Sequence, residues 1–235
     1  MAKKATKTSG STPARPKAPA ANRRDAASLY SMHPSVAMVQ ESIARLKEKT
    51  GRSLDEWLRF IAKEGPKSEP DRRDWLKREH GLGTNYAWWL AERSFGKGEE
   101  HDDPEKYLAK ASHYVETMYA DKKAGLRPIH DRLVQLALAL GKDAKVCPCA
   151  TMVPLYREHV FAQIKPSTNT RLDLGLALAR FVKEGRGKIP SRLIDTGGIA
   201  KRDRITHRIP LATLAEIDAE VERWLRIAYE TDAPA

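Results

Sequence analysis

The sequence predicts an α+β protein in which a small all-helical domain precedes an α+β domain with a mostly antiparallel sheet flanked by helices. Three observations support this prediction. Between residues 36 and 96, apolar residues recur every three or four positions, which is the period of amphipathic helices. Between residues 145 and 176 the spacing changes to the alternation of strands. Helical spacing returns after residue 213, so helices precede and follow the strands.

Residues 1–33 are predicted to form a disordered basic tail. Residues 1–24 contain seven basic side chains, no acidic one, and no Val, Ile, Leu or aromatic residue to bury. The whole chain has 42 Lys and Arg against 31 Asp and Glu, a net charge of +11. Without the seven tail residues, the remaining 35 basic residues exceed the 31 acidic ones by only four. The tail is interpreted either as an electrostatic arm for nucleic acid or as a solubilising extension.

The cellular location is inferred from targeting and membrane signals that the sequence lacks. No apolar run approaches the roughly 18 residues of a membrane span, so no membrane partner is expected. No apolar stretch of the kind found in secretory signals, about 7 to 15 residues, precedes Leu29. Two cysteines are too few for a disulfide-rich secreted protein. The sequence therefore predicts a cytoplasmic bacterial protein.

The helical domain is predicted over residues 34–103, with four helices set by local start and stop signals. They run from Pro34 to Gly51, from the capping box Ser53–Glu56 to Gly65, from Pro70 to Gly81, and from Thr84 to Gly96. Four of the five tryptophans fall within this domain, and packing is their expected role. An exposed Trp88 or Trp89 would instead favour a protein contact. Residues 72–93 also resemble a helix-turn-helix, but 13 basic against 15 acidic residues over 25–103 disfavour DNA reading.

The second domain is predicted over residues 104–235. Two helices come first: one capped by Asp103 and one that Pro128 opens. The expected strands are two short ones within 145–157, broken near Pro148 and Pro154, followed by 159–165, 171–176 and 205–209. A capping box that begins at Thr213 is expected to open the final helix.

One candidate binding surface follows from strand alternation. Leu172, Leu174 and Leu176 share one face, which is expected to be buried, so Arg171 and Asp173 lie on the open face. The preceding strand places His159, Phe161, Gln163 and Lys165 together, and the strand register decides whether Arg157 and His207 join them. The predicted binding residues are Arg157, His159, Lys165, Arg171, Asp173 and His207. They suit a phosphate, a carboxylate or a nucleic-acid backbone. The alternative is an ordinary polar sheet face whose charges pair with one another.

The basic excess of the second domain lies within residues 180–208. This stretch contains nine basic and three acidic side chains and is broken by glycines and Pro190. It is predicted to be a long loop that can close over an anionic ligand.

Signatures of catalysis are missing. The sequence has no phosphate-binding loop, dinucleotide fingerprint, nucleophile elbow or zincin helix. Cys147 and Cys149 lack the second ligand pair of a structural zinc site, so neither a metal nor another cofactor is predicted. No catalytic residue is assigned, and whether the protein is an enzyme stays open, with a non-enzymatic role favoured.

Two groups of residues resemble known domains. The first group is Trp57, Gly65, Trp75–Lys77, His80–Gly83 and Ala87. It resembles a small helical bacterial domain of unknown function. The second group is Phe161–Ala162, Lys165–Thr168, Thr170–Arg171, Asp173–Leu176, His207–Arg208 and Ala228–Tyr229. It resembles an uncharacterised domain sometimes labelled a predicted transport protein. The resemblances imply the two-domain layout and no activity.

The leading functional hypothesis is a non-enzymatic binding or accessory protein. Its second domain and its tail would engage an anionic partner such as nucleic acid. One alternative is a protein that binds an anionic metabolite, or an enzyme, which uses the polar sheet face. Another is a protein-interaction module formed by the tryptophan-rich helical domain.

Overall fold

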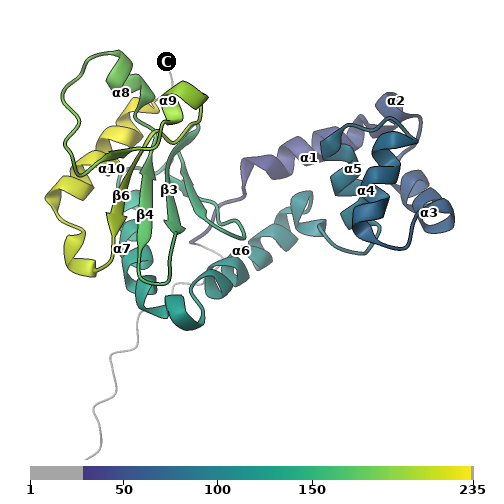
Figure 1. The fold of residues 1–235 in the computed structure, drawn as a ribbon, viewed down its shortest axis with the longest axis horizontal. Helices are drawn as coiled ribbons and strands as arrows, with labels where there is room; N and C mark the ends of the chain where they lie inside the picture. Colours follow the sequence, from purple (N-terminus) through teal and green to yellow (C-terminus); the bar gives the residue numbers. More distant parts are fainter. Residues whose placement is uncertain (1–28, 234–235) are drawn as a thin grey trace, which may run out of the picture.

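The computed structural model describes residues 29–233, which form two lobes (Figure 1). The helical domain makes one lobe and the sheet domain makes the other. The helices α1 (Pro34–Ala44) and α6 (Pro104–Met118) run between them. None of the helices in the described ranges is both long enough and apolar enough to cross a bilayer.

The helical domain contains the predicted helices with two corrections. Its other elements are α2 (Leu46–Thr50), α3 (Leu54–Glu64), α4 (Glu69–Arg78), α5 (Thr84–Arg93) and the 3-10 turn η2 (Glu99–His101). The first predicted helix is divided into α1 and α2 at Arg45, and Gly83 rather than Thr84 is the N-cap of α5. Ser53 and Glu56 form the expected capping box of α3. Gly51 ends α2 in the left-handed region, with φ of 80°. Trp57, Leu76 and Leu90 are buried in a core that belongs to this domain alone.

The second domain contains six strands whose neighbours are all antiparallel. Its elements after α6 are η3 (Asp121–Leu126), α7 (Arg127–Leu138), β1 (Lys145–Val146), β2 (Val153–Tyr156), β3 (Val160–Pro166), β4 (Leu172–Leu176), α8 (Ala179–Lys183), β5 (Ile194–Asp195), α9 (Gly198–Lys201), β6 (His207–Leu211), η4 (Leu214–Glu216) and α10 (Ala219–Thr231). The strand order is β1-β2-β3-β4-β6-β5. The predicted α+β class is confirmed.

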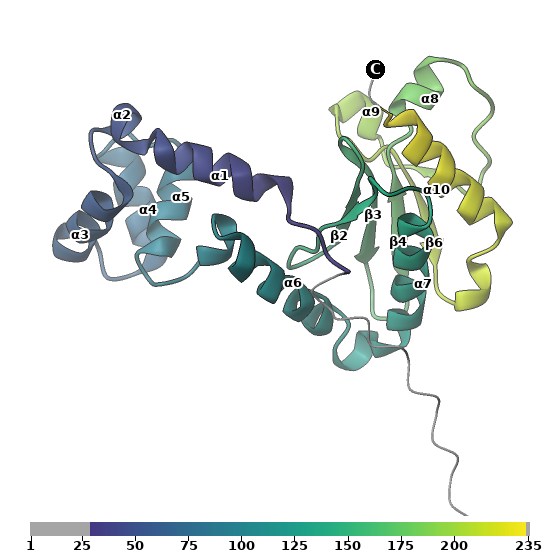
Figure 2. The same ribbon diagram turned by 180° about the vertical axis from the view of Figure 1, so that it is seen from behind.

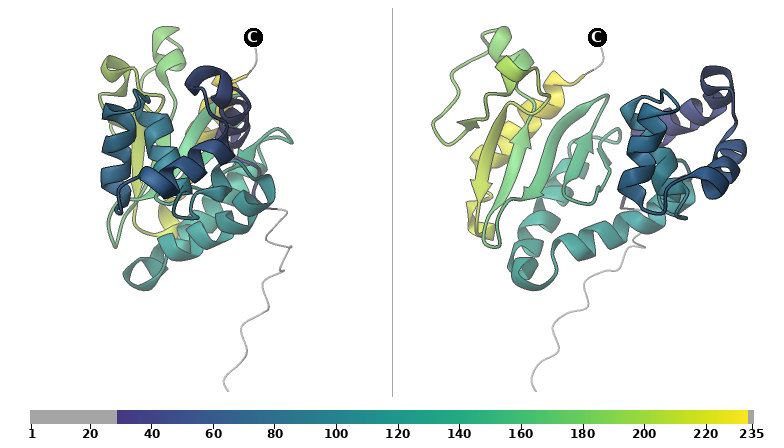
Figure 3. Two further views of the ribbon diagram at one scale, coloured as in Figure 1. Left: turned by 90° about the vertical axis from the view of Figure 1, so that its right-hand side faces the viewer. Right: turned by 45° about the vertical axis from the view of Figure 1, so that its right-hand side comes forward.

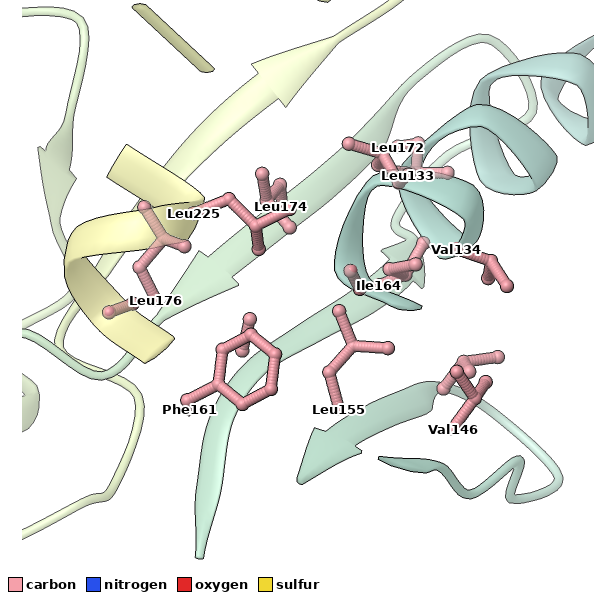
Figure 4. Packing of buried hydrophobic residues seen from close by; sticks show 14 of the residues in the cluster. Leu133, Val134, Val146, Leu155, Phe161, Ile164, Leu172, Leu174, Leu176 and Leu225 are labelled. Atoms are coloured by element: carbon pink, nitrogen blue, oxygen red, sulfur yellow. The ribbon is translucent and has the colours of Figure 1, made fainter. Parts of the chain in front are cut away.

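The helices α7 and α10 pack on one face of the sheet, as the views from opposite sides show (Figures 1 and 2). Leu172, Leu174 and Leu176 of β4 are fully buried against them, as predicted (Figure 4). No helix of the described residues lies across the other face (Figure 3, right). We call it the open face.

A bulge in β3 breaks the predicted alternation. Leu155 pairs with Ala162 and Tyr156 pairs with Val160, so Phe161 is an extra residue without a partner in β2. Its side chain turns into the core and is fully buried, next to Leu155 and Leu176 (Figure 4). The prediction that Phe161 shares the polar face with Lys165 is therefore wrong.

Three other local predictions need correction. Pro154 lies inside β2 rather than breaking it, and its carbonyl accepts a hydrogen bond from the Cys147 N–H at 3.1 Å. The box at Thr213 covers only the 3-10 turn η4, and Asp218 caps α10 instead. The predicted loop 180–208 contains α8, β5 and α9, because residues such as Phe181 and Leu193 pack into the core.

The segment before α1 packs on the sheet domain. The ring of Tyr30 is buried in its core, and the Ser31 N–H donates to the Val146 carbonyl at 2.9 Å. Residues 29–33 of the predicted tail are thus ordered, whereas residues 1–28 lie outside the described part of the chain. His33 caps α1: its Nδ1 accepts from the Ser35 N–H at 3.1 Å, and its Nε2 lies 3.2 Å from the Tyr156 hydroxyl.

The folded protein is expected to lose stability as the pH falls from 7.5 to 5.5. Burial lowers the pKa of His33, His130 and His207 below the ordinary value of 6.5. The unfolded chain therefore binds more protons in this window, so the stabilisation is complete above pH 6.5 and declines through the lower folded values. Urea unfolding at several pH values measures the slope.

The variant His33→Asn provides the matched comparison for this pH dependence. Asparagine also caps helices but does not titrate in this range, so a shallower slope is expected. A slope equal to that of the wild type would show that His33 does not contribute.

Candidate functional site

The six predicted binding residues do not converge. Lys165, Arg171 and Asp173 lie together on the open face, where Lys165 and Asp173 face each other across β3 and β4. Arg171 Nε lies 3.1 Å from Asp173 Oδ1, and Arg208 Nη1 donates to the same oxygen at 3.0 Å. The Ser167 hydroxyl donates to Oδ2 at 2.6 Å. Asp173 therefore holds two arginines in place on the sheet, and this part of the surface pairs its own charges.

His207 is not on the open face. It pairs with Leu176 across β4 and β6, so the two side chains share the buried face. The imidazole is 5% exposed, and its Nδ1 lies 3.0 Å from the Thr206 hydroxyl. The next residue, Arg208, takes the open-face position. The sequence contains a signal for this position: Ile209 and Leu211 point to the buried face, so strand alternation places Arg208 on the opposite face.

Arg157 also lies away from the open face. Its Nε donates to Asp143 Oδ2 at 2.7 Å, and its guanidinium lies 4.3 Å from the centre of the Tyr229 ring. Through these contacts, Arg157 connects Tyr229, in the last turn of α10, with Asp143, in the loop after α7. Arg157 therefore has a structural role in this arrangement.

His159 lines a cleft together with residues of α8, α9 and the C-terminal end of α10. These helices lie at one end of the sheet (Figure 1). We call this cleft the terminal cleft. It has a volume of about 850 Å³ and is lined chiefly by charged side chains: Glu158, His159, Arg180, Lys183, Arg202, Asp203, Arg204 and Asp232. Five arginine, lysine and histidine side chains line the terminal cleft, and four of them come from the predicted basic stretch 180–208.

Two of the arginines build the wall of the terminal cleft. Arg204 pairs with the buried carboxylate of Asp232 and donates from Nε to the Val160 carbonyl at 2.8 Å. Asp232 Oδ2 accepts the His159 N–H at 2.8 Å, which fixes the turn before β3. Arg180 donates to the Thr231 carbonyl at the end of α10 at 3.3 Å. These contacts join α8, β3 and α10 around the cleft.

Two other cations in the terminal cleft have no such partner. Within residues 29–233, neither Lys183 nor Arg202 has a carboxylate within 4.0 Å, and both side chains are exposed. Glu158 and Asp203 line the same cleft and likewise form no ion pair in that part of the chain. The cleft thus contains two cations and two carboxylates that form no ion pair within the described residues.

The backbone that carries Arg202 is strained. Arg202 has φ of 58°, a left-handed conformation that costs a non-glycine residue roughly 1–2 kcal/mol. A Cβ atom on Gly198 would lie 2.4 Å from the Ile205 carbonyl oxygen, so α9 packs too closely for any side chain there. Strain of this kind is concentrated at functional sites. In the sequence, the Gly197–Gly198 pair is the signal for this close packing.

The helical domain has a separate, less polar groove of about 420 Å³ between α1 and α5. Trp88 is 39% exposed and Met38 is 67% exposed at this groove, whereas Trp89 is buried. No side chain that lines it is an arginine, lysine or carboxylate. The groove is therefore unsuited to anions.

The described residues contain no group of three or more His, Cys, Asp and Glu side chains with metal-binding geometry. Burial raises the pKa of Cys147 to about 12, which disfavours the thiolate that binds metals or attacks substrates. Cys149 also has a raised pKa because of burial. The cysteine pair therefore has the properties of packed thiols.

Comparison with known proteins identifies two families. Residues 38–93 match a domain of unknown function, DUF4287, and residues 115–232 match a second, DUF5655. The two matches correspond to the two lobes of the structure and confirm the resemblance to two uncharacterised domains. No curated protein and no solved structure matches the chain. Since the second match covers half of its residues, the chain belongs to the DUF5655 family and has a DUF4287 domain before it.

Proposed function

We propose that the C-terminal domain is a binding module that holds a phosphate-bearing ligand in the terminal cleft. The observation that carries this proposal is the pair of exposed cations, Lys183 and Arg202, which form no ion pair within residues 29–233 while the neighbouring arginines are paired. Phosphate oxygens are the natural partners for such groups because charge-assisted hydrogen bonds are the strongest that these side chains make.

The surrounding structure supports a prepared site. Arg180 and Arg204 hold the cleft open by bonding to backbone carbonyls and to Asp232, so they keep the walls in place without a ligand. The close packing of Gly198 against the Ile205 carbonyl also holds the backbone of α9 beside the cleft. A site that is already ordered loses less entropy when the ligand binds.

Isothermal titration with sodium tripolyphosphate tests the proposal. The double variant Lys183→Gln/Arg202→Asn is expected to bind about tenfold more weakly or worse than the wild type, because each lost contact joins charged groups. Asparagine suits position 202 because it tolerates the left-handed conformation. Equal affinities for the two proteins would reject the proposal.

The variant Glu158→Gln is a control of opposite sign in the same cleft. Removing one carboxylate reduces repulsion of the anion, so the affinity is expected to rise about twofold or more. Weaker binding by this variant would argue for a cationic ligand and against the proposal.

A second candidate function is a protein contact through the helical domain, favoured by the exposure of Trp88 and Met38 at their groove. The variant Trp88→Ala separates the two candidates. It is expected to bind tripolyphosphate as the wild type does, because its groove contains no arginine or lysine. A loss of tripolyphosphate affinity in this variant would show that the phosphate site lies in the helical domain and not in the terminal cleft.

A further inference from the structure

We propose that the partner of this domain is double-stranded nucleic acid, bound through its phosphates at both ends of strand β3. The inference rests on the proposed function of the terminal cleft and adds a second group of cations. The inference names duplex nucleic acid as the class of ligand that contacts both groups of cations.

The second group surrounds a cleft of about 530 Å³ at the opposite end of the sheet, between η3 and the β3–β4 hairpin. We call it the lysine cleft. Lys122, Lys123 and Lys165 line it, together with the Asn169 amide and the Thr151 hydroxyl. Within the described ranges, none of the three lysines has a carboxylate within 4.0 Å. One acidic residue, Asp121, lines the same cleft, which leaves the cations in excess.

The spacing of the two clefts selects the size of the ligand. His159 of the terminal cleft comes just before β3, and Lys165 of the lysine cleft lies within it, six residues further on, which corresponds to at most about 20 Å of extended strand. A small metabolite reaches only one of the clefts. Duplex DNA carries one phosphate per strand for every 3.4 Å or so of its axis, so about six base pairs cover this distance.

Within residues 29–233, the central strands of the open face present no carboxylate that is free of an ion pair. Asp173 is the only acidic side chain in the central strands β3, β4 and β6, and Arg171 and Arg208 both contact it. These arginines outnumber the carboxylate, so the path retains positive charge. A polyanion therefore meets cations at both ends and no net repulsion in between.

The chemistry of the same strands favours a duplex over a single strand. Phe161 is the only aromatic residue other than His207 in β3, β4 and β6, and both side chains are turned into the core. Proteins that bind single strands usually stack bases on exposed aromatic rings. The open face offers side chains for phosphates rather than for bases.

The salt dependence of binding to a 24-base-pair DNA duplex tests the inference in the full chain. Each phosphate contact contributes about 0.9 to the slope of log K against log salt. The variant Lys122→Gln/Lys123→Gln/Lys165→Gln is expected to reduce the slope by up to about 2.7, and Lys183→Gln/Arg202→Asn by up to about 1.8. A variant with Lys49→Gln, Lys67→Gln and Lys77→Gln in the helical domain removes the same charge as the first and is expected to leave the slope unchanged.

The two proposals fail separately in this design. Tripolyphosphate affinity is expected to depend on Lys183 and Arg202 and to be unaffected by the three lysine-cleft substitutions. If those substitutions change the duplex slope no more than the helical-domain control does, the duplex inference is overturned and the terminal cleft keeps its function. If tripolyphosphate affinity is also insensitive to Lys183 and Arg202, both are overturned. Deletion of residues 1–24 measures the tail, and a slope that responds only to this deletion overturns the duplex inference, whereas the terminal cleft is still judged by its tripolyphosphate affinity.

Discussion

The Phe161→Ala protein is expected to lose about 3–5 kcal/mol of its free energy of unfolding. The ring is fully buried and packs edge-on against Tyr229 of α10, with 5.4 Å between the ring centres. Its removal leaves a cavity between the sheet and α10 that the neighbouring side chains can fill only in part. Differential scanning calorimetry of the sheet-domain transition measures the loss.

The variant Leu214→Ala is the matched control for Phe161. Leu214 is 51% exposed in η4, so its truncation is expected to change stability by no more than about 0.5 kcal/mol. If the Phe161 variant is as stable as this control, there is no bulge, and Phe161 lies on the exposed face that simple alternation predicts.

The Trp57→Ala protein is expected to lose a similar amount, about 3–5 kcal/mol, in the helical domain alone. Trp57 is 1% exposed, and its Nε1 donates to the Thr50 hydroxyl at 2.8 Å. The buried cores of the two domains share no residue, so the sheet-domain transition is expected to keep its midpoint. Calorimetry resolves the two transitions.

Trp88→Ala is the comparison for Trp57, because Trp88 lies in the same domain and is 39% exposed. This variant is expected to melt close to the wild type. If Trp57→Ala lowers both transitions equally, the two lobes unfold as one unit, and the separation of the cores does not make them independent.

Helix boundaries were predictable because their signals are local. The capping box at Ser53, Gly51 with positive φ, and Asp103 before Pro104 each act within one turn of the chain. Strand geometry was less predictable because it depends on the partner strand. The bulge at Phe161 is set by pairing between β2 and β3, and the Pro154 carbonyl still accepts a hydrogen bond from Cys147, just after β1.

The candidate site was predicted in part. Alternation placed Lys165 and Asp173 on one face, and these two residues pair in register across β3 and β4. Arg171, just before β4, lies 3.1 Å from Asp173. Alternation failed for His207, whose face is decided by its pairing with Leu176 in β4. The charge count of residues 180–208 identified the region of Lys183 and Arg202, but only the tertiary structure brings them beside His159.

The most direct test of the terminal cleft is amide chemical-shift mapping of the full chain during titration with sodium tripolyphosphate. The largest changes are expected at Ile199, Arg202 and Thr231, which line the cleft, and they are expected to saturate together. Saturating changes centred on Gly175 of the open face, or no saturating change at all, would contradict the assignment of the phosphate site to the terminal cleft.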